Sequence, residues 1–334
     1  MEEVIAGVDL GGTSTKFGLV TTNGQLLTKH EIKTDSLKSY EDFFAQLYQE
    51  LINLVEQSDV KVRLAGIGVG APNGNSRTGV IDDASNLLWR GKVPVVEMLT
   101  SISGLPVSLS NDANAAAIGE LLFGAARGLH DFVVITIGTG LGSGIVANGE
   151  LLLGKDGHAG ELGHTTVYYD GRKCSCGKIG CLETYVSAKG LVTTANEFIK
   201  RDYPDSKLAG LDESEIDSMK VTAAALDGDE ASLMAFDYTG KILGMKLADT
   251  VAHLNPEAFI ISGGLANAGE LLFDPTRKYL EEHLLSFYKG NIKVIPSQIS
   301  EINSAILGTA AQLWNQLKPS KINMSNDSGH FTMN

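Results

Sequence analysis

The sequence predicts an α/β protein made of two α/β domains that face each other across a cleft. Two observations support this fold class. The chain has 334 residues, more than one hydrophobic core usually organises. A pattern of strand, glycine-rich turn and strand also occurs twice, and Gly138 repeats Gly12 after 126 residues. Two halves built alike would aim both glycine-rich turns at the space between them.

The first copy of the pattern lies at the N-terminus. Residues 4–9 have the apolar composition of a short strand, 10–15 are rich in glycine and hydroxyl side chains, and 16–20 read as a second strand. Asn23-Gly24 then predicts a type I′ hairpin turn.

The second copy has the same order. Residues 132–137 predict a strand, 138–143 a glycine-rich turn and 144–146 a further strand, followed by Asn148-Gly149 as another hairpin signal. The resemblance between the copies indicates an internal duplication.

The remaining elements follow from hydrophobic periodicity and from capping residues. We expect a small domain over 1–112 and a large domain over 113–303, with the C-terminal helix returning to the small domain and a mobile tail over 318–334. An acidic stretch over 202–220 predicts a surface excursion. The further expected elements are helix 40–56, strand 65–69, helix 113–122 opened by Asn111 or Asp112, strand 258–262 and helix 304–317.

The composition argues against several classes of partner. The net charge of -13, without a run of Lys and Arg, disfavours binding to duplex nucleic acid. No apolar run approaches the ~20 residues that span a bilayer, and the N-terminus lacks the pattern of a signal peptide. We therefore expect a cytoplasmic protein with no membrane partner.

All three cysteines of the chain lie within eight residues of one another, at Cys174, Cys176 and Cys181. Three thiolates and one imidazole satisfy the tetrahedral preference of Zn²⁺, and the nitrogen donor could be His158 or His164. Because no ligand position would remain open, such a zinc ion would be structural.

The glycine-rich turns carry groups that suit phosphate. Backbone N–H groups and hydroxyls can cradle phosphate oxygens, and Asp9 beside a triphosphate predicts a Mg²⁺ ligand, directly or through water. The expected nucleotide-binding residues at the two turns are Asp9, Gly11, Gly12, Thr13 and Lys16 in the first and Gly138 and Thr139 in the second.

Asp112 occupies a position where side chains project from strand ends into a cleft. One interpretation is that this aspartate caps the helix and has no further role. Near a hydroxyl substrate, however, it could orient the hydroxyl and accept its proton during phosphoryl transfer.

The segment from His158 to Glu183 resembles the signature of the ROK family of sugar kinases and repressors, and most of all its bacterial glucokinases. The matching residues are His158-x-Gly160-Glu161-x-Gly163-His164, Gly171, Cys174-x-Cys176-Gly177 and Gly180-Cys181-x-Glu183. The motifs at Asp9, Asn111-Asp112, Gly138 and Ser262-Gly263-Gly264 stand in the family's order, so the resemblance covers nearly the whole chain.

The resemblance implies the actin-like ATPase fold, which is hexokinase-like and ribonuclease H-like, and ATP-dependent phosphorylation of a hexose at its 6-hydroxyl. It assigns Asp112 as the catalytic base and Gly263 and Gly264 to the adenosine. It assigns the sugar hydroxyls to Asn86, Asn111, Asp112, Glu161, His164 and Glu183, and it selects His164, Cys174, Cys176 and Cys181 as the zinc ligands.

Glucose is the expected hexose, and N-acetylmannosamine, N-acetylglucosamine, allose or fructose are alternatives. A sugar-sensing repressor is a further alternative, which we disfavour because only eight residues precede Asp9 where repressors of the family carry a winged helix-turn-helix. We expect a homodimer or homotetramer.

Overall fold

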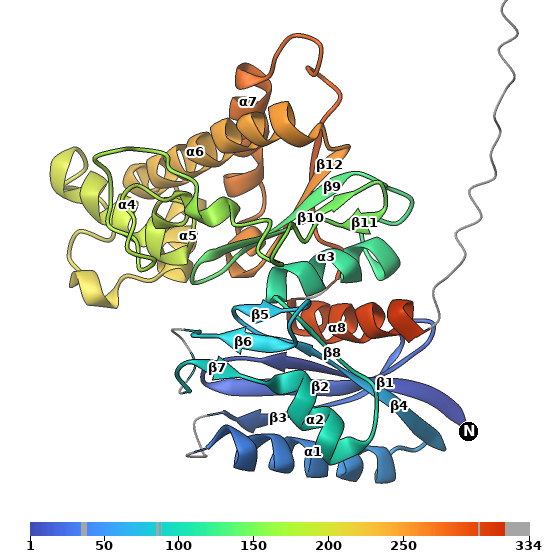
Figure 1. Ribbon diagram of the computed structural model, residues 1–334. Coiled ribbons are helices and arrows are strands. Elements are labelled where there is room, and N and C mark those ends of the chain that lie inside the picture. Colours follow the sequence, from blue (N-terminus) through green and yellow to red (C-terminus); the bar gives the residue numbers. More distant parts are fainter. Residues whose placement is uncertain (35–38, 85–86, 88, 300, 318–334) are drawn as a thin grey trace, which may run out of the picture.

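The computed structural model describes residues 1–34, 39–84, 87, 89–299 and 301–317. Two five-stranded sheets form its framework, one in each half of the chain (Figure 1). The first sheet contains β1 (Glu2–Leu10), β2 (Ser14–Thr21), β3 (Leu26–Lys33), β4 (Val62–Gly70) and β8 (Val107–Ser110). The second contains β9 (Phe132–Ile137), β10 (Leu141–Ala147), β11 (Glu150–Leu151), β12 (Ala258–Ser262) and β13 (Lys293–Pro296).

The two sheets have equivalent strand orders. The first runs β3-β2-β1-β4-β8 and the second β11-β10-β9-β12-β13. Within each, the two strands that flank the glycine-rich turn pair antiparallel, and the first of them also pairs parallel with a later strand. The repeated sequence pattern therefore corresponds to a repeated topology. A small third sheet of β5 (Gly74–Asn75), β6 (Val80–Asp82) and β7 (Lys92–Val93) extends the first half.

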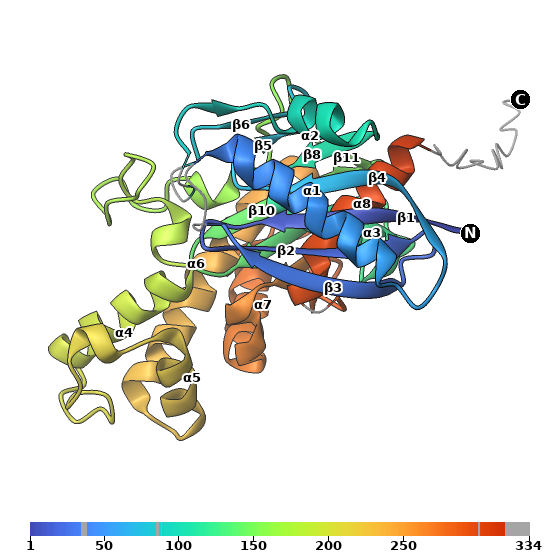
Figure 2. The same cartoon turned by 90° about the horizontal axis from the view of Figure 1, so that it is seen from below.

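Helices cover both sheets, and two of them lie between the halves. Figure 1 shows α3 and α8 stacked at the junction, while Figure 2 shows α4 and α5 projecting to one side. The helices are α1 (Tyr40–Glu56), α2 (Val95–Ser103), α3 (Asp112–Phe123), α4 (Ala188–Arg201), α5 (Ser218–Leu226), α6 (Glu230–Leu254), α7 (Glu270–His283) and α8 (Glu301–Leu317). The described part of the chain also contains the short 3₁₀ turns η1 (Leu162–His164), η2 (Leu182–Thr184), η3 (Glu213–Glu215) and η4 (Gly264–Ala268).

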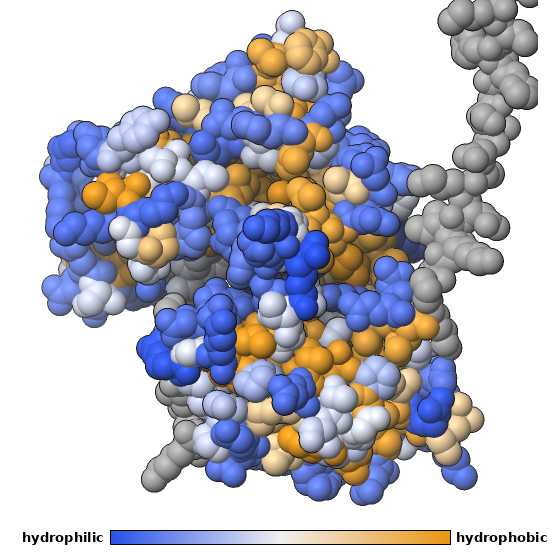
Figure 3. Space-filling model, viewed as in Figure 1, coloured by the Kyte–Doolittle hydropathy of each residue, from blue (hydrophilic) through white to orange (hydrophobic). Residues whose placement is uncertain are grey.

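The distribution of apolar side chains explains this arrangement. The largest buried clusters lie on the helix-covered faces of the two sheets, with Phe43 and Phe44 in the first half and Phe236 and Phe259 in the second. On the face shown in Figure 3, hydrophilic side chains cover most of the region of α4 and α5, and hydrophobic ones gather over the first half and along the junction. Among the residues that the structure describes, no helix combines the length and apolar character needed to cross a bilayer.

α8 packs against the first sheet. Its residues Ile306, Leu313 and Trp314 pack with Ile5 and Val20 of the first sheet. The expected helix 304–317 therefore exists, three residues longer at its start.

α3 and α8 cross at a point that only glycine permits. A Cβ on Gly308 would lie 1.9 Å from the carbonyl oxygen of Ala115 in α3, which is well inside van der Waals contact. At this crossing the backbones of the two helices are therefore in direct contact.

Most other expected elements also match. The expected helix 40–56 and strand 258–262 coincide with α1 and β12, and strand 65–69 lies within β4. The 202–220 stretch is largely exposed and contains η3. The expected tail over 318–334 lies outside the described residues.

One turn differs from the prediction. Asn148 and Gly149 both have positive φ, as a type I′ turn requires, but at Asn23-Gly24 only Gly24 does. The Gly24 N–H donates to the Thr21 carbonyl, and the Thr21 hydroxyl donates to the Asn23 side chain and accepts from the Gln25 N–H at 3.0 Å. These side-chain bonds stabilise a longer loop than the dipeptide alone predicts.

Candidate active site

Asp9 and Lys16 lie opposite each other where β1 and β2 approach their turn. The turn is closed by the Gly11 N–H, which donates to the Ser14 carbonyl at 3.1 Å. Gly12 and Thr13 lie at its tip, and Thr13 is exposed. The first predicted phosphate-binding turn is therefore open to solvent, with one carboxylate and one ammonium group behind it.

Asp112 begins α3, and Asn111 before it is the N-cap. The Asn111 side-chain oxygen accepts from the N–H groups of Ala113 at 2.9 Å and Asn114 at 3.4 Å, which decides between the two capping candidates. The Asp112 carboxylate accepts from the Ala113 N–H at 2.8 Å. Asp112 is thus held in place without being the cap.

The charge of Asp112 influences the ionisation of Asp9. Burial, then the neighbouring charge of Asp112, raise the pKa of Asp9 from 3.8 to about 6, although Lys16 opposes the shift. Loss of hydration in its surroundings also raises the pKa of Asp112, against the hydrogen bond from the Ala113 N–H. The end of β1 and the start of α3 therefore form one acidic site. A carboxylate with a raised pKa is a stronger general base.

The second glycine-rich turn lies beside the end of β12. Gly138 and Thr139 connect β9 to β10, and Gly263 follows β12, which pairs with β9. Gly263 has a φ of 92°, and a Cβ there would lie 2.5 Å from the Ile137 carbonyl oxygen. The sequence-predicted phosphate and adenosine residues of the second half, Gly264 included, are therefore neighbours.

A pocket between the halves contains two of the predicted sugar-binding residues, Asn111 and Glu161. Asp112, His164 and Glu183 are not part of its lining in the described structure, and Asn86 lies outside the described residues. The sequence analysis missed most of the other residues that line the pocket. The other lining residues are Asn73, Gly74, Asn114, Gly142, Ser143, Gly157, His158, Ala159 and Gly160. The Asn73-Gly74 dipeptide was an available signal, because such pairs mark turns and Asn73 has positive φ.

His164 connects the pocket to the cysteine cluster. Its Nε2 lies 4.0 Å from Glu161, and its Nδ1 lies 3.9 Å from Glu183 and 3.7 Å from the Cys174 sulfur. Glu183 also accepts from the Leu141 N–H at 3.2 Å, next to the second glycine-rich turn. One histidine and one glutamate thus connect the pocket, the cluster and that turn.

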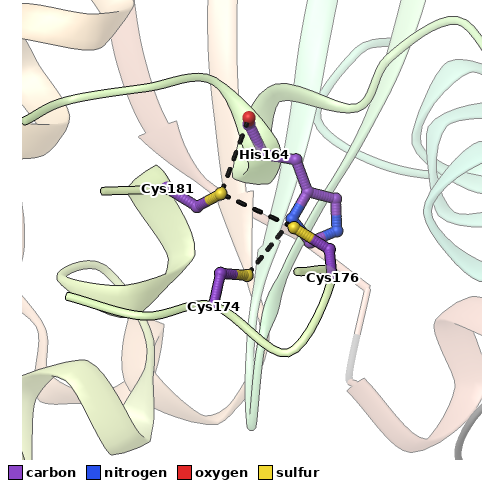
Figure 4. Close-up of side chains that lie close together, drawn as sticks. All are labelled: His164, Cys174, Cys176 and Cys181. Atoms are coloured by element: carbon purple, nitrogen blue, oxygen red, sulfur yellow. Dashed lines mark hydrogen bonds between the residues drawn. The ribbon is translucent and has the colours of Figure 1, made fainter. Parts of the chain in front are cut away.

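The side chains of His164, Cys174, Cys176 and Cys181 point toward one another (Figure 4), with their ligand atoms within 4.8 Å. Four ligands about 2.3 Å from a common centre, at tetrahedral angles, are separated by about 3.8 Å. Two separations fit: 3.7 Å between the Cys176 and Cys181 sulfurs and 3.7 Å between the Cys174 sulfur and His164 Nδ1. The donor set therefore suits a tetrahedral metal ion.

His158, the other nitrogen donor that the spacing allowed, lies elsewhere. It lines the pocket, and its Nε2 is 3.3 Å from the side-chain nitrogen of Asn75.

Burial raises the pKa of the Cys174 thiol to about 12, so a metal ion that binds at the cluster must displace its proton.

Comparison with known proteins identifies the family. Residues 5–316 match the sequence pattern of the ROK family. The chain belongs to the ROK family. A glucokinase of Halalkalibacterium halodurans is 38% identical over 288 residues, which cover 84% of this chain and 86% of that protein.

A solved structure extends the comparison to the fold. The ROK family glucokinase of Streptomyces griseus, determined with glucose and AMPPNP, is 32% identical, with a TM-score of 0.78, and the match covers 94% of this chain and 99% of that one. The chain therefore has the actin-like ATPase fold. The family also contains regulators: a xylose repressor of Caldicellulosiruptor bescii is 31% identical over 92% of this chain and 77% of that protein.

Proposed function

We propose that this protein is a glucokinase, which transfers the γ-phosphoryl group of ATP to the 6-hydroxyl of D-glucose with Asp112 as general base. The chain is an ATP-dependent sugar kinase, and the proposal adds the hexose, the base and the metal ions. The observation that carries it is the acidic site of Asp9 and Asp112, which lies beside a pocket lined by Asn111 and Glu161.

The sugar-binding step depends on fixed polar groups. Asn111 and Glu161 line the pocket, and the sugar hydroxyls would also meet Asp112, His164 and Glu183 as the halves close. Glu183 is held by the Leu141 N–H and by its contact with His164, so both side chains would bind the sugar without losing much further side-chain entropy. Asn86 would complete the set.

Asp112 would accept the proton of the 6-hydroxyl. Its raised pKa favours acceptance of the proton from the 6-hydroxyl as the bond to phosphorus forms, and its bond from the Ala113 N–H fixes its orientation. Closure of the two halves would exclude water that could otherwise take the phosphoryl group. The crossing of α3 and α8 is the contact about which this closure would occur.

The nucleotide would occupy the two glycine-rich turns. Gly11, Gly12, Thr13 and Gly138-Thr139 offer N–H groups and hydroxyls to the phosphates, with Lys16 near them, and Gly263-Gly264 leave room for the adenosine. A Mg²⁺ ion held by Asp9, directly or through water, would neutralise phosphate charge.

We also propose that the cluster of His164, Cys174, Cys176 and Cys181 holds a structural Zn²⁺. Such an ion would hold the loop that carries His164 and Glu183, and the proposal is supported by the donor set and its spacing. Metal loss would then impair sugar binding before nucleotide binding.

The experiment that tests the proposal measures ADP release with Mg-ATP across glucose, mannose, fructose, allose, N-acetylglucosamine and N-acetylmannosamine. We expect glucose to give the highest kcat/KM. A preference for an acetamido sugar would replace glucose by that substrate. Hexose binding without ADP release from any sugar would instead favour a sugar-sensing regulator. Light scattering in the same buffer tests the proposed homodimer or homotetramer.

A further inference from the structure

Asn75 joins the two halves of the chain at the edge of the pocket. It belongs to β5 in the first half, and its side-chain nitrogen donates to the Asp156 carbonyl in the second half at 2.7 Å. The same nitrogen lies 3.3 Å from His158 Nε2. Asn75 is only 5% exposed, and its neighbours Asn73 and Gly74 line the pocket. The bond to Asp156 therefore runs from a buried side chain to a backbone carbonyl at the edge of the pocket.

The hydrogen bonds of Asn75 determine which ring nitrogen of His158 carries a proton. The Asn75 side-chain oxygen accepts from the N–H groups of Arg77 at 2.9 Å and Thr78 at 3.2 Å. Its nitrogen must then be the group that faces His158, and an amide nitrogen only donates. His158 Nε2 is consequently the acceptor, so the neutral ring carries its proton on Nδ1.

Glycine at position 157 allows this approach. Gly157 has a φ of 86°, and a Cβ there would lie 2.7 Å from the Asn75 side-chain oxygen. On its other side the loop is held by Ser143, whose hydroxyl donates to the Gly160 carbonyl. Residues 156–160 are thus attached to both halves, directly before Glu161.

We propose that Asn75 is a positioning residue and His158 a specificity-determining residue of the hexose pocket. Asn75 holds residues 156–160 against the first half and donates to His158 Nε2, which leaves Nδ1–H as the donor of the neutral ring. That donor serves an acceptor oxygen of the bound sugar. The inference rests on the proposed function, because it takes the ligand of this pocket to be a hexose.

The substitution Asn75→Asp tests the donor with almost no change of shape. Aspartate can still accept from the Arg77 and Thr78 N–H groups, but its second oxygen cannot donate to Asp156 or His158. We expect the Kd for the hexose to rise about tenfold, because the Asp156 carbonyl loses its donor and residues 156–160 lose their bond to the first half. We expect the KM for ATP to change by less than about twofold, since the nucleotide residues make none of these bonds. The exposed Asn291→Asp adds the same charge away from the pocket and serves as the control.

The tautomer provides a readout that needs no substrate. Long-range ¹H–¹⁵N spectra of the wild type should show His158 protonated at Nδ1 and unprotonated at Nε2. In Asn75→Asp the proton should move to Nε2, because that nitrogen then faces an acceptor. An unchanged tautomer in a folded Asn75→Asp protein would overturn the inference, whatever the activity.

A second variant keeps the test independent of folding at position 75. His158 is exposed, so His158→Ala removes the ring without opening a buried cavity. We expect a raised KM for the hexose with kcat and the KM for ATP nearly unchanged. An unchanged KM for the hexose overturns the role of His158. Failure of the wild type to phosphorylate any hexose overturns the proposed function instead, and that result precedes any variant.

Discussion

Asp9→Asn should stabilise the protein at neutral and alkaline pH while it removes a residue that we assign to Mg²⁺. Folding raises the pKa of Asp9 from 3.8 to about 6, chiefly through burial and the nearby Asp112. Well below pH 3.8 the carboxyl is protonated in both the folded and unfolded states, so its ionisation contributes nothing to the difference in stability. As the pH rises toward 6 the unfolded state ionises first, and the folded state loses relative stability.

The size of this effect follows from the two pKa values. The difference between 3.8 and about 6 corresponds to about 3 kcal/mol of folding free energy at pH 8. Asparagine removes the ionisation with little change of shape. We therefore expect Asp9→Asn to exceed the wild type by about 3 kcal/mol at pH 8 and by almost nothing at pH 3.5.

Urea unfolding at these two pH values, without nucleotide or sugar, measures the difference. Trp89 and Trp314 both pack in the first half, so tryptophan fluorescence follows the part of the molecule that contains Asp9. The exposed Asp59→Asn removes the same charge from the first half and controls for net charge. A stability gain at pH 8 no larger than that at pH 3.5 would refute the reasoning.

Three further predictions concern catalysis, metal and the junction. Asp112→Asn should lower kcat about 100- to 10,000-fold while ATP binding persists, measured by coupled ADP release. Cys176→Ser should lose bound zinc by metal analysis and raise the Kd for the hexose about tenfold, with a smaller effect on ATP. Gly308→Ala should destabilise the protein by about 1–3 kcal/mol in thermal melts, since its Cβ would meet the Ala115 carbonyl at 1.9 Å.

Each of these has a result that would contradict it. Near-normal turnover of the Asp112 variant would remove that residue from the role of base. A zinc-free, folded Cys176 variant with unchanged hexose affinity would show that the metal does not hold the sugar pocket. Gly210→Ala is the control for Gly308, because no atom lies within 4 Å of the added Cβ there. Equal melting of the two alanine variants would argue against a tight crossing of α3 and α8.

Local sequence signals predicted the framework well because they depend on neighbours along the chain. The period of the apolar residues placed α1 and β12 with their observed bounds, and the repeated glycine-rich turns anticipated two sheets of one topology. The cysteine spacing likewise predicted a cluster, because a short loop brings its thiols together in almost any fold. The prediction of a type I′ turn at Asn23-Gly24 was wrong, because hydrogen bonds of the Thr21 side chain stabilise a longer loop there.

The sequence by itself determined the fold class, the two glycine-rich turns and the chemical types of the candidate site residues. Only the tertiary structure decided which of them meet. It placed His158 against Asn75, 83 residues away, and it placed His164 with the cysteines, a choice that spacing left open and that the family resemblance had made. It also brought Asp9 close enough to Asp112 to raise its pKa. These outcomes depend on how the two sheets pack through α3 and α8, and distances across such a junction leave no periodic signal in the sequence.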